Sequence, residues 1–225
     1  MSVEIVKAKP QAPSKFLVIG EPFSGKTTLA AKSPKPIFIS TDGNAAKAGH
    51  AGINVKSSQD VRDALKLALD SKAYETIVID TIEGIADLFT PEAITSYNIA
   101  NHSNYTEAEK IPYYGANKFL NKILERFFTA LASINKNVIV LSYTKRSLDE
   151  ATNTFQLTSE LKQINKLTKF MDAYIITTFD GEKYEARLIS KRETIGEVEY
   201  GSIEPFLQAS GWTLSKKSVK IRKNK

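Results

Sequence analysis

The sequence predicts an α/β fold in which a mostly parallel central sheet is flanked by helices and followed by a C-terminal β-hairpin. Three observations predict it. Short apolar runs of strand length alternate with stretches of helical periodicity, the pattern of a parallel sheet that is covered on both faces. A glycine-rich turn follows the first apolar run. Near the C-terminus an Asp-Gly pair separates two β-rich runs, and this pair is a strong signal for a hairpin.

The composition is that of an ordinary globular domain. The chain has 225 residues, of which 42% are apolar and 25% charged, enough to bury a sizeable core. It has no cysteine, which excludes a disulfide framework and a thiolate zinc site. We expect an N-terminal extension over residues 1–14, one domain over 15–214, and a basic tail over 215–225. With no signal-type segment and no apolar run of membrane-spanning length, we expect a soluble cytoplasmic protein and no membrane partner.

The first half of the chain predicts three strands and two helices. Each strand is a short run of β-branched or aromatic residues that ends at a glycine or an aspartate. The helix over residues 58–71 has Val61, Leu65 and Leu69 on one face, with Ser57 or Ser58 as its N-cap. The expected strands span residues 15–20, 37–39 and 76–80, and the expected helices span 25–32 and 58–71.

The second half predicts further helices, a fourth strand and the hairpin. Two helices, over 82–100 and 116–135, are separated by a polar segment that bears tyrosines. A strand over 138–141 is followed by a polar loop and by a helix over 159–169. The hairpin then runs over 173–179, turns at Asp180-Gly181 and returns over 184–189.

The strongest motif lies directly after the first predicted strand. Residues 20–27 match G-x-x-x-x-G-K-[ST] at every fixed position, between a strand and a helix, which is the context that a P-loop requires. Backbone N–H groups of such a loop surround phosphate oxygens, the lysine reaches the β and γ phosphates, and the hydroxyl ligates Mg²⁺. We therefore expect ATP and Mg²⁺ to bind here. The expected nucleotide-binding residues are Gly20, Glu21, Pro22, Phe23, Ser24, Gly25, Lys26, Thr27 and Thr28.

Carboxylates at two other strand ends are candidates for the remaining chemistry. The strand over 76–80 ends in Asp80, which is expected to ligate Mg²⁺ together with Thr27. Thr81 follows it, so a water-polarising glutamate is not found directly after this aspartate. Asp42, at the end of the strand over 37–39, is the candidate for that role, and Glu83 is the alternative. Asp42 also suits a turn or capping position beside Gly43.

A P-loop, a strand ending in an acid, and IVID followed by Thr resemble the RecA-like recombinase core. Over residues 15–212 the chain looks most like the compact phage proteins of that class, the Sak-type single-strand annealing proteins. The resemblance implies a DNA-dependent ATPase that assembles into a ring or filament and assists annealing or recombination. It places a catalytic glutamate where Asp42 stands, and because aspartate is one methylene shorter, slow hydrolysis is expected.

The resemblance also implies roles for residues after the P-loop. Ser142 or Thr144, at the end of the fourth strand, stands where the family has a γ-phosphate sensor. Lys191 and Arg192 resemble the cations that reach a neighbouring subunit's γ phosphate, although two solvated charges would look the same in sequence. Single-stranded DNA contacts are expected from the loop over residues 145–155 and from the tyrosines and lysines of residues 101–118.

Several features keep other interpretations open. Tyr113 and Tyr114, just before a helix, suit packing as well as base stacking. Trp212 is interpreted as a core residue, and His50 and His102 lack metal-ligand spacing. The basic tail suits either nucleic-acid contact or a solvated terminus. Two other functional classes remain, a P-loop kinase and a nucleotide-gated interaction protein that barely hydrolyses ATP.

Overall fold

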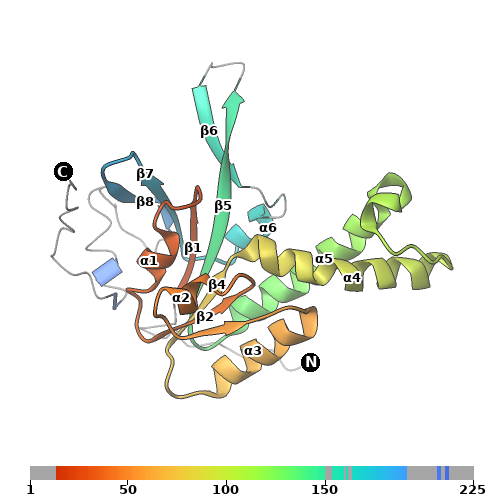
Figure 1. Ribbon diagram of the computed structural model, residues 1–225, viewed down its shortest axis with the longest axis horizontal. Helices are drawn as coiled ribbons and strands as arrows, with labels where there is room; N and C mark the ends of the chain where they lie inside the picture. The colour runs from red at the N-terminus through yellow and green to blue at the C-terminus, as the bar shows by residue number, and fades with distance from the viewer. Residues whose placement is uncertain are drawn as a thin grey trace, which may run out of the picture.

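The strands of the chain form one twisted sheet with helices on both faces (Figure 1). The computed structural model describes residues 14–149, 154–159, 161, 164–191, 207–208 and 211–212. The strand order is β3-β2-β4-β5-β1-β7-β8, with β6 paired to β5. All neighbours from β3 to β7 are parallel, and the β5–β6 and β7–β8 pairs are antiparallel. The predicted α/β fold class, a mostly parallel central sheet flanked by helices and followed by a C-terminal β-hairpin, is confirmed.

The elements follow one another as strands and crossover helices. The strands are β1 (Lys15–Gly20), β2 (Pro36–Ser40), β3 (Gly52–Asn54), β4 (Thr76–Asp80), β5 (Asn137–Asp149), β6 (Thr154–Ser159), β7 (Ala173–Phe179) and β8 (Tyr184–Lys191). The helices are α1 (Lys26–Ala30), α2 (Asn44–Lys47), α3 (Ser58–Asp70), α4 (Ile82–Asn101), α5 (Gly115–Ser133) and α6 (Ile164–Thr168), with 3₁₀ turns η1 (Ala108–Lys110) and η2 (Pro112–Tyr114).

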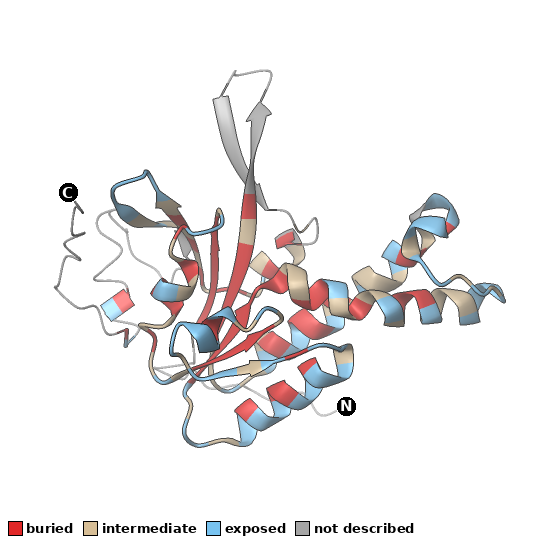
Figure 2. Cartoon of the chain, in the orientation of Figure 1, coloured by how far each residue is buried: buried red, intermediate tan, exposed pale blue. Residues whose placement is uncertain are grey.

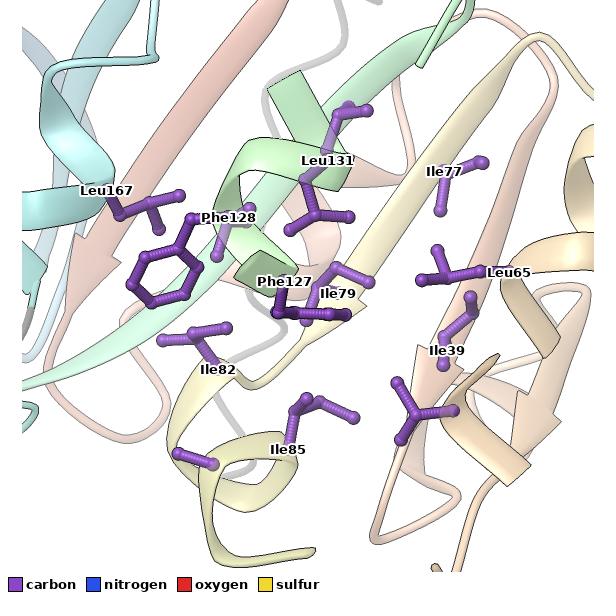
Figure 3. Close-up of a cluster of buried hydrophobic side chains, with 14 of the residues drawn as sticks. Ile39, Leu65, Ile77, Ile79, Ile82, Ile85, Phe127, Phe128, Leu131 and Leu167 are labelled. Carbon is purple, nitrogen blue, oxygen red and sulfur yellow. The ribbon is translucent and has the colours of Figure 1, made fainter. Parts of the chain in front are cut away.

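The central strands are buried on both faces, as Figure 2 shows. All six residues of β1 and all five of β4 are buried, so their sequences read as continuous apolar runs rather than as alternating patterns. Helices α3 to α6 cover one face (Figure 3), where Ile77, Ile79 and Phe128 are fully buried. Helices α1 and α2, together with Leu207 and Trp212, cover the other face. The Trp212 ring lies 5.7 Å from that of Phe16, which confirms its interpretation as a core residue.

Two parts of the chain project from this body (Figure 1). Strand β5 was predicted to end at residue 141, but it continues to Asp149 and pairs with β6, so the expected polar loop is largely a hairpin. We call residues 144–159 the β5–β6 arm. On another side the outer ends of α4 and α5, with η1 and η2 between them, project as a helical hairpin. A small separate cluster around Ile94, Ile111 and Tyr97 holds this projection together.

Candidate nucleotide-binding site

The parallel strands bring the predicted site residues to one edge of the sheet. Gly20, at the end of β1, is paired with Tyr143 on β5 and with Thr177 on β7. On the neighbouring strands Ser40 is paired with Asp80. The carboxyl ends of these strands therefore meet, and ligands of open α/β sheets bind at this edge.

The loop between β1 and α1 has a conformation that glycine makes possible. Gly25 has φ 88° and directly precedes α1, a left-handed backbone that glycine adopts without steric cost. A β-carbon on Gly20 would lie 2.3 Å from the Ser24 hydroxyl and 2.6 Å from the backbone oxygen of Thr177. The Ser24 and Thr177 hydroxyls are themselves hydrogen-bonded at 2.8 Å. The loop is thus fastened to β7, which lies on the far side of β1 from β4.

The side chain of Lys26 lies back over the loop of residues 20–27. Its side chain is only 5% exposed, and its ammonium donates hydrogen bonds to the carbonyl oxygens of Gly20 at 2.9 Å and Glu21 at 2.8 Å. The same ammonium lies 4.4 Å from the ring centroid of Tyr143. The lysine is therefore held where the motif predicts the phosphates to bind.

Thr27 and Asp80 meet although 53 residues separate them in the sequence. The Thr27 hydroxyl donates a hydrogen bond to Asp80 Oδ2 at 2.9 Å. Burial raises the pKa of the Asp80 carboxyl above its ordinary value, and the nearby charge of Asp42 raises it further. The hydrogen bond from Thr27 and the charge of Lys26 act in the opposite direction. Two oxygen groups, one of them a buried carboxylate with a second carboxylate nearby, form an environment that favours a bound cation.

Asp42 is exposed, and its carboxylate accepts hydrogen bonds from the backbone N–H of Asn44 at 3.0 Å and from the Asn44 side-chain amide. This is the turn arrangement that was one of its two expected roles. Asp42 nevertheless follows the end of β2 by two residues, and this end is paired with Asp80 through Ser40. Asp42 therefore lies at the same sheet edge as the metal-binding candidates, and its charge is one of the causes that raise the pKa of Asp80.

Glu83 has a different environment, in the first turn of α4. Its Oε1 accepts hydrogen bonds from the Ser142 hydroxyl at 2.5 Å and from the backbone N–H of Tyr143 at 3.1 Å. Its Oε2 is buried and has no hydrogen-bond partner in the described part of the chain. Burial is the main cause that raises the pKa of this carboxyl. Of the two sensor candidates, Ser142 is bonded to Glu83, whereas the buried hydroxyl of Thr144 finds no partner among the described residues.

An aromatic pair beside the loop was not predicted. Phe179 and Tyr184 flank the turn between β7 and β8, and their rings are stacked with centroids 4.4 Å apart. A β-carbon on Gly25 would lie 3.1 Å from the Tyr184 ring. Phe23, at the loop apex, is 91% exposed. No local pattern marks Tyr143 or Tyr184, because only the pairing of distant strands brings them to the loop.

The other predicted residues are placed only in part. Lys191 is the last residue of β8 and only its backbone is described, whereas Arg192 lies outside the described residues, as do the N-terminal extension up to residue 13 and the basic tail. Residues 145–149 and 154–155 of the expected DNA loop belong to the β5–β6 arm and are described by their backbone alone, whereas residues 150–153 lie outside the described residues. Tyr113 is fully exposed with φ 54°, so in this structure it is not a packing residue. No group of three or more potential metal ligands of the His, Cys, Asp and Glu types occurs in the described ranges.

A comparison with protein families agrees with the motif, since the model of a family described as an AAA domain matches residues 12–196. Similar solved structures include the KaiC-like protein PH0186 from the hyperthermophilic archaeon Pyrococcus horikoshii OT3, at 12% identity and TM-score 0.48 over 84% of this chain and 83% of that one. A second structure, described as an ATPase domain, aligns at 12% identity and TM-score 0.48 over 80% and 78% of the two chains. The RadB recombinase aligns at 16% identity and TM-score 0.44 over 80% and 83%.

No curated protein shows significant sequence similarity to the chain. In the described part of the structure, no helix combines the length and the apolar character that crossing a membrane would require.

Proposed function

The chain belongs to the AAA domain family, and from this premise we propose that it binds and hydrolyses ATP and acts on single-stranded DNA. We further propose that its hydrolysis is stimulated by DNA and assists single-strand annealing or homologous recombination, in the manner of the phage Sak-type proteins. One observation carries the nucleotide proposal. Lys26 lies across the loop of residues 20–27, and Thr27 meets Asp80 beside it.

The residues at this edge fit Mg²⁺. Mg²⁺ prefers hard oxygen ligands and is bound through one or two carboxylates together with phosphate oxygens. The Thr27 hydroxyl and the Asp80 carboxylate supply such oxygens, and the raised pKa of Asp80 indicates that its charge is poorly compensated by the protein alone. These two residues would hold the ion, which would neutralise charge on the phosphates when bound.

Side chains of the protein would stabilise the charge of the phosphoryl group and orient the attacking water. Lys26 provides a fixed positive charge for the transferred phosphoryl group. We assign the orientation of the attacking water to Asp42, whose charge is felt at Asp80, with Glu83 as the alternative because its Oε2 is buried and finds no partner in the described ranges. Asp42→Asn would abolish turnover if Asp42 has this role, whereas Glu83→Gln would do so if Glu83 has it.

The Phe179–Tyr184 pair provides a surface for the base. Tyr184 is 58% exposed and lies against Gly25, next to the expected phosphate position. An exposed aromatic face that is already stacked on a second ring is suited to the flat apolar face of a nucleobase. Tyr184→Ala is expected to weaken ATP binding without affecting the P-loop itself.

DNA contact is assigned to the two projecting parts. The β5–β6 arm continues from the strand that carries Ser142 and Tyr143, and its sequence contains Lys145 and Arg146. Tyr113, at the end of the helical projection, presents a fully exposed ring that can stack on an unpaired base. Assembly into a ring or filament would bring Lys191 and Arg192 to a neighbour's nucleotide, which is the arrangement that the RecA-like resemblance implies.

A nucleotide-gated interaction protein is the second candidate. The observation that favours it is Asp42, whose carboxylate oxygens are both hydrogen-bonded to Asn44. A carboxylate engaged in this way is less available to orient a water molecule, which would make hydrolysis slow.

The decisive experiment measures steady-state ATP hydrolysis with and without single-stranded DNA at low and moderate salt, alongside equilibrium ATP binding. We expect DNA to stimulate turnover, and the stimulation to decrease as salt rises because phosphate contacts release counterions. Lys26→Ala is the control and should remove turnover. ATP binding without turnover would favour the nucleotide-gated interaction protein. Transfer of phosphate to an acceptor would indicate a kinase. Turnover that is the same with and without DNA would contradict the recombination proposal.

A further inference from the structure

Tyr143 has its place fixed by two independent contacts of its backbone. In the sheet it is the residue of β5 paired with Gly20, the first residue of the P-loop. Its N–H donates a hydrogen bond to Glu83 Oε1 at 3.1 Å, and Glu83 stands on the first turn of α4. The position of the Tyr143 backbone is therefore determined by the sheet and by α4 rather than by the loop itself.

The ring of Tyr143 meets the ammonium of Lys26. The Lys26 Nζ lies 4.4 Å from the ring centroid, well within the range of about 6 Å over which the negative face of an aromatic ring attracts a cation. Lys26 is 5% exposed, so water screens this attraction little. The carbonyl oxygens of Gly20 and Glu21 accept hydrogen bonds from the same ammonium.

We propose that Tyr143 is a positioning residue for Lys26, whose ring holds the lysine ammonium over the P-loop before phosphate arrives. The proposal rests on the nucleotide-binding function proposed above. A free lysine side chain samples many rotamers, and ordering it at the moment of binding reduces affinity. Tyr143 removes much of that cost in advance. We assign the effect to the face of the ring rather than to the hydroxyl.

Three variants separate the ring from the hydroxyl and from general packing. Tyr143→Leu removes the aromatic face, and Tyr143→Phe keeps it. Tyr97→Leu is the matched control, since Tyr97 packs on Tyr105 and Phe119 in the helical projection, away from the P-loop. We expect Tyr143→Leu to raise the Kd for Mg-ATP by about five- to thirtyfold, the range between a cation–π contact at an exposed site and a desolvated one. Tyr143→Phe and Tyr97→Leu should bind within about twofold of the unaltered protein.

A readout that needs no nucleotide tests the position of Lys26 directly. The rate at which an amine-reactive acylating reagent modifies Lys26 is followed by peptide mass spectrometry. This rate should rise in Tyr143→Leu and stay unchanged in Tyr143→Phe and Tyr97→Leu. If the unaltered protein fails to bind ATP, the proposed function falls, but the acylation rates still decide whether Tyr143 positions Lys26.

A graded series keeps the test decisive if Tyr143→Leu folds poorly. Phenylalanine with increasing numbers of fluorine atoms at position 143 preserves ring shape while it withdraws negative charge from the ring face. A stepwise rise in Kd and in the Lys26 acylation rate with fluorine number supports the proposal. Values that stay flat across the series, or an equal loss in Tyr143→Phe and Tyr143→Leu, would overturn it.

Discussion

Gly20 has no room for a β-carbon, because the neighbouring strand approaches it with backbone as well as side chain. In Gly20→Ala the new methyl group would lie 2.3 Å from the Ser24 hydroxyl and 2.6 Å from the Thr177 carbonyl oxygen. We expect a loss of about 1–3 kcal/mol in the free energy of unfolding, as for other overpacked sites, measured by denaturant titration. Gly52→Ala is the control, since its methyl group would meet Phe38 and Ala45 at 3.5 Å or more. An unchanged midpoint in Gly20→Ala would contradict the close approach.

The buried carboxylate of Asp80 should lower the stability of the folded chain at neutral pH, while it provides a charged ligand for a cation. Burial raises the pKa of this carboxyl in the folded chain, so the folded state holds the proton to higher pH than the unfolded state does. Its contribution to stability therefore falls as pH rises from the ordinary carboxyl range through the raised value. At pH 7 the Asp80→Asn variant, which can still accept the hydrogen bond from Thr27, should melt a few degrees higher than the unaltered protein.

Binding of Mg-ATP should reverse the order of thermal stability of Asp80→Asn and the unaltered protein. With Mg-ATP the unaltered protein should gain more stability than Asp80→Asn, because only the carboxylate provides a charged ligand for the ion. Thermal melts at pH 7, with and without Mg-ATP, provide both comparisons. A variant that is less stable without ligand would show that the charge of Asp80 is well compensated by the protein.

Some of the individual residues of the site could be predicted from the sequence. The P-loop motif and the strand that ends in Asp80 predicted that Thr27 and Asp80 would meet, because the carboxyl ends of parallel strands lie at the same edge of a sheet. Tyr143 and Tyr184 could not be predicted in the same way. Their rings reach Lys26 and Gly25 only through the pairing of β1 with β5 and through the packing of the β7–β8 turn.

The C-terminal end of helix α3 is capped by Lys136, which lies in the turn between α5 and β5. The ammonium of Lys136 donates hydrogen bonds to the carbonyl oxygens of Ala68, Ser71 and Tyr74, at and just beyond the last turn of α3. A cation at this end complements the helix dipole and satisfies carbonyls that lack partners within the helix. Lys136→Met should therefore lower the free energy of unfolding by about 1–3 kcal/mol, measured by denaturant titration.

A second lysine is the matched control for that experiment. Lys66 lies on the exposed side of α3, so Lys66→Met removes the same charge without removing a cap. Its free energy of unfolding should change by less than about 0.5 kcal/mol. Equal effects in the two variants would show that net charge, rather than capping, is responsible.

The β5–β6 arm can be removed without disturbing the sheet. Thr144 and Ser159 are paired at the base of the arm, so replacing residues 145–158, which include Lys145 and Arg146, with Asn-Gly would close a tight hairpin there. We expect the shortened protein to bind ATP normally and to lose most of its stimulation by single-stranded DNA. Hydrolysis assays over a DNA titration measure this, and full stimulation in the shortened protein would move DNA binding to another surface.

The sequence predicted elements best where burial dictated the pattern. Strands β1 and β4 and helix α3 were located to within one residue, because apolar runs and an N-cap at Ser57 mark them. The outer half of β5 was missed because its residues, from Lys145 to Asp149, are mostly polar. The pairing with β6 extends this strand, and such pairing leaves no apolar signature. Strand β3 was missed for a related reason, since it has three residues at the sheet edge.

The candidate nucleotide-binding residues lie at one edge of the sheet, and the β5–β6 arm and the α4–α5 helical hairpin project from the body (Figure 1). Both faces of the sheet are already covered by helices, so a partner subunit would approach the edge at which the strands end. Phe23, Tyr184 and Asp42 are exposed there. In the ring or filament that we propose, an interface at this edge would pair one surface of the chain with a different surface of the next, because such head-to-tail contacts generate rings or filaments.

Mixing two inactive variants tests this arrangement. Lys26→Ala removes a subunit's own P-loop cation, and Arg192→Ala removes the cation that we expect to act on the neighbour. Neither variant alone should turn over ATP. In a mixture, a site formed by the P-loop of the Arg192→Ala subunit and the arginine of the Lys26→Ala subunit is complete. At equal amounts and random assembly, about a quarter of the interfaces would be of this kind, so turnover should recover to about a quarter of the level of the unaltered protein.

Recovery that grows with total protein concentration would place the site between subunits. If Arg192→Ala is fully active by itself, Arg192 has no part in the reaction. If both variants are inactive and their mixture stays inactive, Arg192 acts within its own subunit.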